Sequence, residues 1–98
     1  MQETAEDAVA TVAICGELDA AIAPVLSRYL ARVAQRRPAR MAFELADVGF
    51  MDCAAARAII GAGRALPGSP RPVLRHPRPI VHRLLSLTGL DVECTVIP

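Results

Sequence analysis

Two short segments of the chain carry side chains that could act at a surface. Gly16-Glu17-Leu18-Asp19 ends on a carboxylate, and Gly49–Ala55 contains Asp52 followed directly by the thiol of Cys53. Asp52 stands before an alanine-rich stretch, so we expect its carboxylate to cap a helix by accepting the free amide hydrogens of the first turn. The same carboxylate would then be displayed where the helix begins.

Cys53 allows two interpretations. At a helix N-terminus, the helix dipole and the free amides stabilise a thiolate and increase its reactivity toward oxidants, but the adjacent Asp52 charge opposes this. Alternatively, Cys53 is a small, partly buried side chain that copies the shape of serine without its chemistry, and we prefer this second interpretation. Cys15 and Cys94 lie in predicted strands and are expected in the core.

The sequence offers little support for catalysis. His76 lies in a proline-rich turn and His82 on the expected exposed face of a helix, and neither is close to Cys53 in the predicted arrangement. The cysteines and histidines lack the spacing of a metal site, and there is no glycine-rich phosphate loop. The sequence therefore predicts a non-enzymatic protein without metal or cofactor.

Composition limits the remaining classes. A chain of 98 residues makes one domain, 1–98, and 53% hydrophobic residues with only 3% aromatics predict an aliphatic core. All eleven basic residues are arginine, but ten acids nearly balance them, which argues against direct nucleic-acid binding. The densest basic stretch, Arg36–Arg40, is interpreted as a solvated loop.

Compartment and membrane association follow from the same composition. No apolar run approaches the length of a membrane span, so we expect no membrane insertion. Three cysteines do not make a disulfide framework, and a reducing cytoplasm is the expected location.

The hydrophobic pattern predicts alternating strands and helices. In order, these are a strand over Val9–Ile14, a helix over 22–33 with Pro24 in its first turn, a strand over Met41–Leu45, a helix over 54–65, a short strand at Val73-Leu74, a third helix introduced by Pro77 and Pro79 and ended by Gly89, and an edge strand over Asp91–Ile97.

Two of these elements carry more detailed expectations. In the third helix, Ile80, Leu84 and Leu87 are predicted to form the buried face. In the last strand, Val92, Cys94 and Val96 alternate with polar neighbours, which indicates one wet face.

Strand–helix–strand alternation with short connections favours parallel pairing through right-handed crossovers. We therefore expect an α/β fold with about four strands in a mostly parallel or mixed sheet and three helices packed mainly on one face. Functional loops gather at the carboxyl ends of such strands, so Asp19 and Asp52 should be neighbours in space. Asp19 lies outside the helix stripe and has little apparent structural role, which favours a contact with a partner.

Over residues 9–97, the chain resembles the STAS domain of bacterial anti-sigma-factor antagonists. The resemblance is carried by Gly16–Asp19, by Phe50-Met51-Asp52, and by Pro79–Leu90, which is similar to the family's third helix and its Gly-Leu end. An additional N-terminal strand of the family would have to fit into Met1–Asp7.

The resemblance implies a binding surface and a switch. Where the family tends toward Asp-Ser-Ser-Gly-Leu-Gly, this chain has Asp52-Cys53-Ala54-Ala55-Ala56-Arg57. In the family, a partner kinase phosphorylates the serine that follows the aspartate and so abolishes binding; Cys53 occupies this phosphorylation-equivalent position and has no hydroxyl. In this chain the partner-binding surface that the resemblance implies consists of Asp19, Asp52, Cys53, Ala54 and Arg57, and Arg57 places a cation near a surface that is usually small and apolar in the family.

The implied function is regulation of transcription by partner switching, as in bacterial stress responses. The protein would be a monomer or weak dimer that binds an anti-sigma factor of the serine-kinase type. Two alternatives stay open: a STAS subunit of a membrane lipid or anion transport assembly, and a thiol-based redox sensor acting through Cys53.

Overall fold

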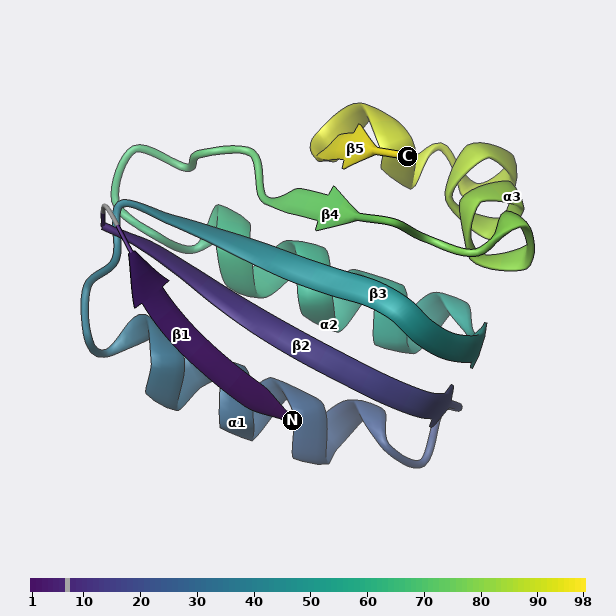
Figure 1. Cartoon of the computed structure of the whole chain (residues 1–98), viewed down its shortest axis with the longest axis horizontal. Coiled ribbons are helices and arrows are strands. Elements are labelled where there is room, and N and C mark those ends of the chain that lie inside the picture. Colours follow the sequence, from purple (N-terminus) through teal and green to yellow (C-terminus); the bar gives the residue numbers. More distant parts are fainter. Residues whose placement is uncertain (7) are drawn as a thin grey trace.

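A five-stranded sheet forms the centre of the molecule (Figure 1). The computed structural model describes residues 1–6 and 8–98. The elements in chain order are β1 (Gln2–Glu6), β2 (Val9–Leu18), α1 (Ala23–Ala34), β3 (Arg40–Met51), α2 (Cys53–Arg64), β4 (Val73–Arg75), α3 (Pro79–Thr88), a 3₁₀ turn η1 (Leu90–Glu93) and β5 (Thr95–Ile97).

The strands lie in the sheet in the order in which they occur in the chain. β1 pairs antiparallel with β2, and β2 to β5 are parallel, so each parallel connection runs through a helix. Successive crossovers of one hand place their helices on the same face, and α1 and α2 lie side by side behind the sheet in Figure 1. The predicted α/β class is confirmed. The sheet has five strands rather than four, because residues before Val9 form β1.

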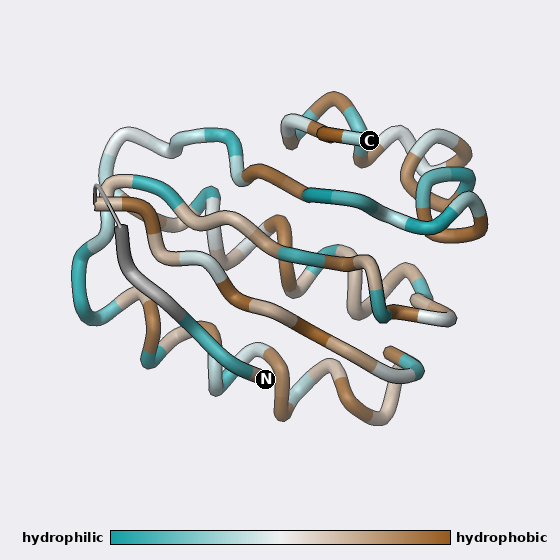
Figure 2. Tube along the Cα trace, in the orientation of Figure 1, coloured by the Kyte–Doolittle hydropathy of each residue, from teal (hydrophilic) through white to brown (hydrophobic). Residues whose placement is uncertain are grey.

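The core lies between the sheet and its helices. Alternate residues of the strands face inward, and they meet the apolar stripe of α1 and the alanine- and isoleucine-rich side of α2. Figure 2 shows hydrophobic positions recurring along the central strands and along both helices. The inward-facing residues at the centre of the core are Val12, Ile14, Met41, Phe43, Leu45, Leu26, Leu30 and Ile59. The core is aliphatic around one phenylalanine, as the composition predicts.

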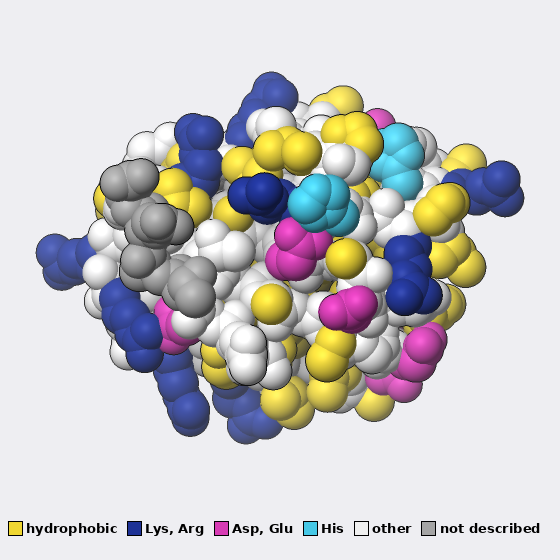
Figure 3. Space-filling model, in the orientation of Figure 1, with side chains coloured by type: hydrophobic (Ala, Val, Ile, Leu, Met, Phe, Trp, Pro, Cys, Tyr) yellow, Lys and Arg dark blue, Asp and Glu magenta, His cyan; other side chains and the backbone are white. Residues whose placement is uncertain are grey.

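The opposite face of the sheet is open, and Figure 3 looks directly onto it. Val12 and Ile14 of β2 point toward the helices, so Ala13 and Cys15 point to the open face and are exposed. The prediction that Cys15 lies in the core was therefore wrong. Strand periodicity gives two faces but does not say whether helices cover both.

The buried face of α3 also differs from the prediction. Val81 and Leu85 are buried, whereas Ile80 and Leu87 are 55% and 80% exposed. The helix carries two overlapping apolar stripes, and only its packing against the end of the sheet selects between them. Pro79 lies in the first turn of α3, and Gly89 ends it in a left-handed conformation with φ of 75°, as predicted.

The segment predicted as one edge strand is divided in two. Leu90–Glu93 forms the turn η1, and only Thr95–Ile97 pairs with β4. Val92 is exposed because it belongs to the turn, while Leu90 anchors the turn in the core. Cys94, between the two parts, is buried as predicted.

Cys94 provides a test of this packing. Burial, assisted by the nearby charges of Asp91 and Glu93, raises the pKa of Cys94 from 9.0 to about 11. The folded state therefore keeps a proton that the unfolded state loses first. We expect the free energy of unfolding to be undiminished by this group below pH 9 and to fall as the pH rises from 9 toward 11.

Urea titrations at several pH values measure this dependence. The chain has no lysine, so few other groups titrate in the window. Cys94→Ala should flatten the decline even if it lowers stability overall, and Cys15→Ala on the open face is the matched control. An unchanged pH dependence in Cys94→Ala would contradict the assignment.

Candidate functional site

The carboxyl ends of β2 and β3 bring the two motifs together. Leu18 pairs with Met51 at the last position of the parallel ladder, and the Asp52 amide donates a hydrogen bond of 2.9 Å to the Leu18 carbonyl. Asp19 and Asp52 each follow one member of this pair. The prediction that the two motifs are neighbours in space is confirmed.

Asp52 is the N-cap of α2. Its backbone is extended, with φ of −93° and ψ of 174°, and its Oδ1 accepts a hydrogen bond of 2.9 Å from the Ala55 amide. Its carbonyl accepts the first intrahelical bond, from Ala56 at 3.0 Å. The predicted cap is confirmed, and it fixes the direction in which Cys53 leaves the strand end.

Asp19 has a local structural role that the sequence analysis missed. Its Oδ1 accepts a hydrogen bond of 3.2 Å from the Ile22 amide, which also lies 3.2 Å from the Asp19 carbonyl. This bond orders the turn between β2 and α1, while the Asp19 side chain stays exposed. The signal was an aspartate just before a helix, a residue that commonly bonds to the backbone of its own turn.

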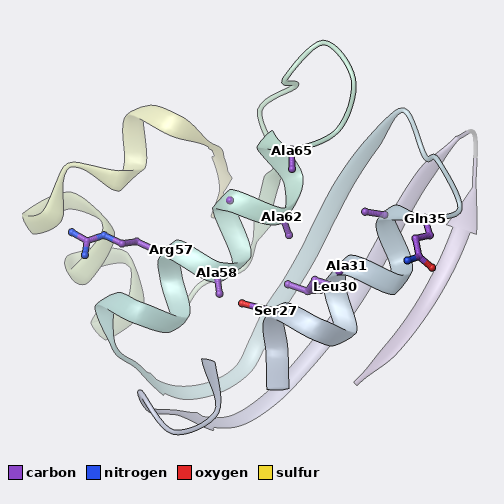
Figure 4. Close-up of a pocket in the computed structure, with 10 residues that line it drawn as sticks. Ser27, Leu30, Ala31, Gln35, Arg57, Ala58, Ala62 and Ala65 are labelled. Atoms are coloured by element: carbon purple, nitrogen blue, oxygen red, sulfur yellow. The ribbon is translucent and has the colours of Figure 1, made fainter. Parts of the chain in front are cut away.

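The residues after Asp52 differ in how far they are exposed to solvent. Cys53, the first residue of α2, is half-buried and packs against the core, whereas Ala54 is exposed. Arg57 is exposed one turn further along, and its side chain extends away from α1 in Figure 4. Asp52, Cys53, Ala54 and Arg57 thus all lie on the first turns of α2.

Glu17 of β2 and Gly49 of β3 lie close together near the ends of these two strands. The Glu17 side chain lies over Gly49, where an added Cβ would fall 2.6 Å from Glu17 Oε1. Any side chain at position 49 would displace Glu17. The glycine therefore lets the acidic residue of the first motif lie across the strand that leads to the second.

Phe50 is a candidate site residue that the sequence analysis did not single out. It pairs with Glu17 and is 40% exposed, although its neighbour Met51 is 4% exposed. Because side chains alternate along a strand, burial of Met51 turns Phe50 outward. An exposed aromatic ring beside Asp52 adds apolar area to the surface, as partner-binding surfaces commonly have.

The histidines do not join this site. His76 Nδ1 lies 3.0 Å from both carboxylate oxygens of Glu44 on the open face of the sheet, where Arg75 Nε is 3.9 Å from Oε2. His82 is exposed on α3, as predicted. Within residues 1–6 and 8–98, no group of three or more His, Cys, Asp or Glu side chains could hold a metal ion. Over the same residues, no helix is long and apolar enough to cross a membrane.

The fold and the capped strand end define a small α/β domain of the mixed-sheet class, with its conspicuous polar surface at the carboxyl edge of β2 and β3. The chain belongs to the STAS domain family, whose model matches residues 2–98.

Solved structures with the same fold include an anti-sigma factor antagonist from Mycobacterium paratuberculosis, 24% identical, with a TM-score of 0.87 over 99% of this chain and 83% of the other. A putative anti-sigma factor antagonist from Thermotoga maritima is 21% identical, with a TM-score of 0.87 over 99% and 85%. The unphosphorylated form of the anti-sigma factor antagonist SpoIIAA is 18% identical, with a TM-score of 0.79 over 99% and 87%. No curated protein matches the sequence.

Two variants of Asp52 separate the stabilising effect of its capping hydrogen bond from the effect of its negative charge. Asp52→Ala removes the acceptor of the Ala55 amide and should lower the free energy of unfolding by about 1 kcal/mol. Asp52→Asn keeps an acceptor oxygen, so it should cost clearly less. Chemical denaturation of both variants measures the difference, and equal losses would show that the hydrogen bond is not what Asp52 contributes to stability.

Proposed function

We propose that this protein is a regulatory binding protein of the anti-sigma-factor antagonist type, and that it binds its partner through the strand-end surface formed by Asp19, Asp52, Cys53, Ala54 and Arg57. The observation that carries the proposal is the pairing of Leu18 with Met51, because it holds both acidic motifs at one edge of the sheet. Phe50 adds an exposed apolar element to that surface.

The partner is an anti-sigma factor of the serine-kinase type. Binding of this partner releases the sigma factor that it holds, and the protein acts in the cytoplasm as a monomer or weak dimer, without binding nucleic acid itself. Family membership and the anti-sigma factor antagonists among the structures with the same fold support this partner class.

The protein does not catalyse a reaction in this proposal. The two carboxylates at the site are engaged with the backbone amides of Ala55 and Ile22, and His76 contacts Glu44. These contacts fix the conformation of the strand-end surface. That surface offers a partner the charges of its carboxylates, the half-buried thiol of Cys53 and the exposed ring of Phe50.

Control of binding differs from that of phosphorylated relatives. SpoIIAA has been solved in both an unphosphorylated and a phosphorylated form. In this chain the phosphorylation-equivalent position, which directly follows the N-cap of α2, is Cys53. A thiol does not take the place of a serine hydroxyl in a serine kinase reaction, so the protein remains competent to bind.

The absence of this switch can be measured directly. After incubation with a serine kinase that acts on STAS domains and with ATP, mass spectrometry should find no phosphate on Cys53, while Cys53→Ser should become phosphorylated at that position. Phosphate on Cys53 itself would contradict the proposal. Stoichiometric phosphate on Ser27, Ser69 or Ser86 would mean that the switch lies elsewhere in the chain.

A negative charge at position 53 should imitate the phosphorylated state of the family. Cys53→Asp places two carboxylates side by side in an interface and should weaken binding to the anti-sigma factor by at least about tenfold, whereas Cys53→Ala should change it little. Titration calorimetry or surface plasmon resonance gives both affinities. Cys15→Asp, on the open face of the sheet, is the matched control and should bind normally.

If Cys53→Asp and Cys53→Ala bind equally well, position 53 lies outside the interface. If Cys15→Asp loses binding to the same extent, the open face of the sheet is the binding surface.

A further inference from the structure

The outer surfaces of α1 and α2 enclose a groove of about 470 Å³ (Figure 4). Small side chains line it on both sides, so it remains open although the two helices pack together beneath it. On α1 these are Ser27, Ala31 and Ala34, and on α2 they are Ala58, Gly61 and Ala62. A Cβ added to Gly61 would meet no described atom within 4 Å.

All charged residues of α1 and α2 are arginines, and among them Arg57 lines the groove. On α1, Arg28 and Arg32 are four residues apart and share one side of the helix, where they line a separate hollow with Met1, Val25 and Tyr29. On α2, Arg57 and Arg64 are two turns apart and likewise share one side. Arg57 lines the groove itself.

No acidic residue opposes these arginines on either helix. The sequence has no Asp or Glu from Ala20 to Phe43 and none from Cys53 to Leu90, although the whole chain has a net charge of only +1. Among the residues that the structure describes, the acids therefore lie in the strands, at the strand ends and in η1, while α1 and α2 carry positive charge alone. Such a separation gives the helix layer a positive electrostatic potential that the small net charge of the whole chain does not reveal.

We propose that this groove binds an acidic amphipathic helix of a partner protein. An apolar ridge on such a helix would enter the groove between the small residues, and its carboxylates would be attracted by Arg57 at the groove and by the positive field of the acid-free helix layer. Arginine suits this role because its planar guanidinium bonds to a carboxylate through two parallel hydrogen bonds.

The positive charge of the helix layer argues against a second copy of the same chain as the molecule that occupies the groove. Two helix layers facing each other would bring arginine against arginine. The exposed apolar helix α3 of a second copy is no better suited to the groove, because it carries His82 and Arg83 and no acid.

Shape and composition argue against a membrane or a nucleic acid. A membrane-binding surface has protruding large apolar side chains, but among the described residues the exposed large hydrophobics, such as Val25, Ile80 and Leu87, do not line the groove. The lining also lacks the aromatic rings on which single-stranded bases stack.

The groove is distinct from the strand-end surface of the proposed function, and the two share only Arg57. The test therefore leaves Arg57 and position 53 unchanged. Ala31 and Gly61 are both exposed, so glutamate can replace them without entering the core. Glutamate is also a better helix former than the glycine it replaces.

The probe is a synthetic peptide of about 20 residues, long enough to be helical on its own, with a leucine ridge flanked by glutamates. A second peptide has lysine at every glutamate position. We expect fluorescence anisotropy to show that the acidic peptide binds at least about tenfold more tightly than the basic one, and that its affinity falls as salt screens the charges. Amide shifts in NMR spectra should change along the facing sides of α1 and α2.

The double variant Ala31→Glu/Gly61→Glu should weaken binding of the acidic peptide by at least about tenfold, because it places like charge in the groove. Arg28→Gln/Arg64→Gln should weaken it less and reduce its salt dependence. Ser86→Glu, at an exposed position of α3, is the matched control and should bind as the parent does. Circular dichroism confirms that each variant is folded.

The proposal is overturned if the acidic peptide does not bind, if the basic peptide binds as well, or if the double groove variant binds like Ser86→Glu. Groove-dependent self-association in sedimentation experiments would assign the surface to a second copy. Groove-dependent binding to anionic vesicles or to a single-stranded oligonucleotide, in place of the peptide, would assign it to those ligands.

Discussion

The parallel pairing of β2 with β3 is the constraint on which both binding surfaces depend. The ladder runs from Val9 beside Arg40 to Leu18 beside Met51, with two register irregularities along the way. Its carboxyl end places Asp19 next to Asp52. Its crossover helix, α1, packs beside α2 because both connections have the same hand, and this packing creates the groove. A slip of one residue in this ladder would exchange the buried and exposed faces of a strand and remove both surfaces together.

The two strand-end aspartates combine structure with recognition. In each, one carboxylate oxygen accepts a hydrogen bond from a backbone amide, that of Ala55 for Asp52 and that of Ile22 for Asp19, and Asp19 is exposed. A carboxylate held in this way has already lost much of its rotational freedom, so a partner that binds it loses less entropy. These hydrogen bonds therefore prepare both carboxylates for binding, while Asp52 also caps α2 and Asp19 orders the turn before α1.

The sequence predicted the features that depend on residue periodicity and on the positions where strands end. It did not predict the features that depend on which faces of the sheet and of the helices are covered. The alternation of elements, the Asp52 cap, the end of α3 at Gly89 and the proximity of Asp19 to Asp52 all follow from local pattern. The exposure of Cys15 and the choice of Val81 over Ile80 do not, because each segment has two apolar faces and only tertiary packing chooses between them. The groove could not be predicted from the sequence for the same reason, because its lining comes from two helices whose relative placement depends on the sheet.

The separation of charge within the molecule argues that the two surfaces serve different ligands. At the strand end, carboxylates stand beside an exposed phenylalanine and a half-buried thiol, whereas the helix layer offers a groove of small residues and has arginines as its only charged residues on α1 and α2. A ligand complementary to one surface in charge is repelled by the other. Arg57, on the first turns of α2, is the point where the two meet. A partner held at the strand end therefore leaves most of the groove free, and the fold has room to join two binding events on one small domain.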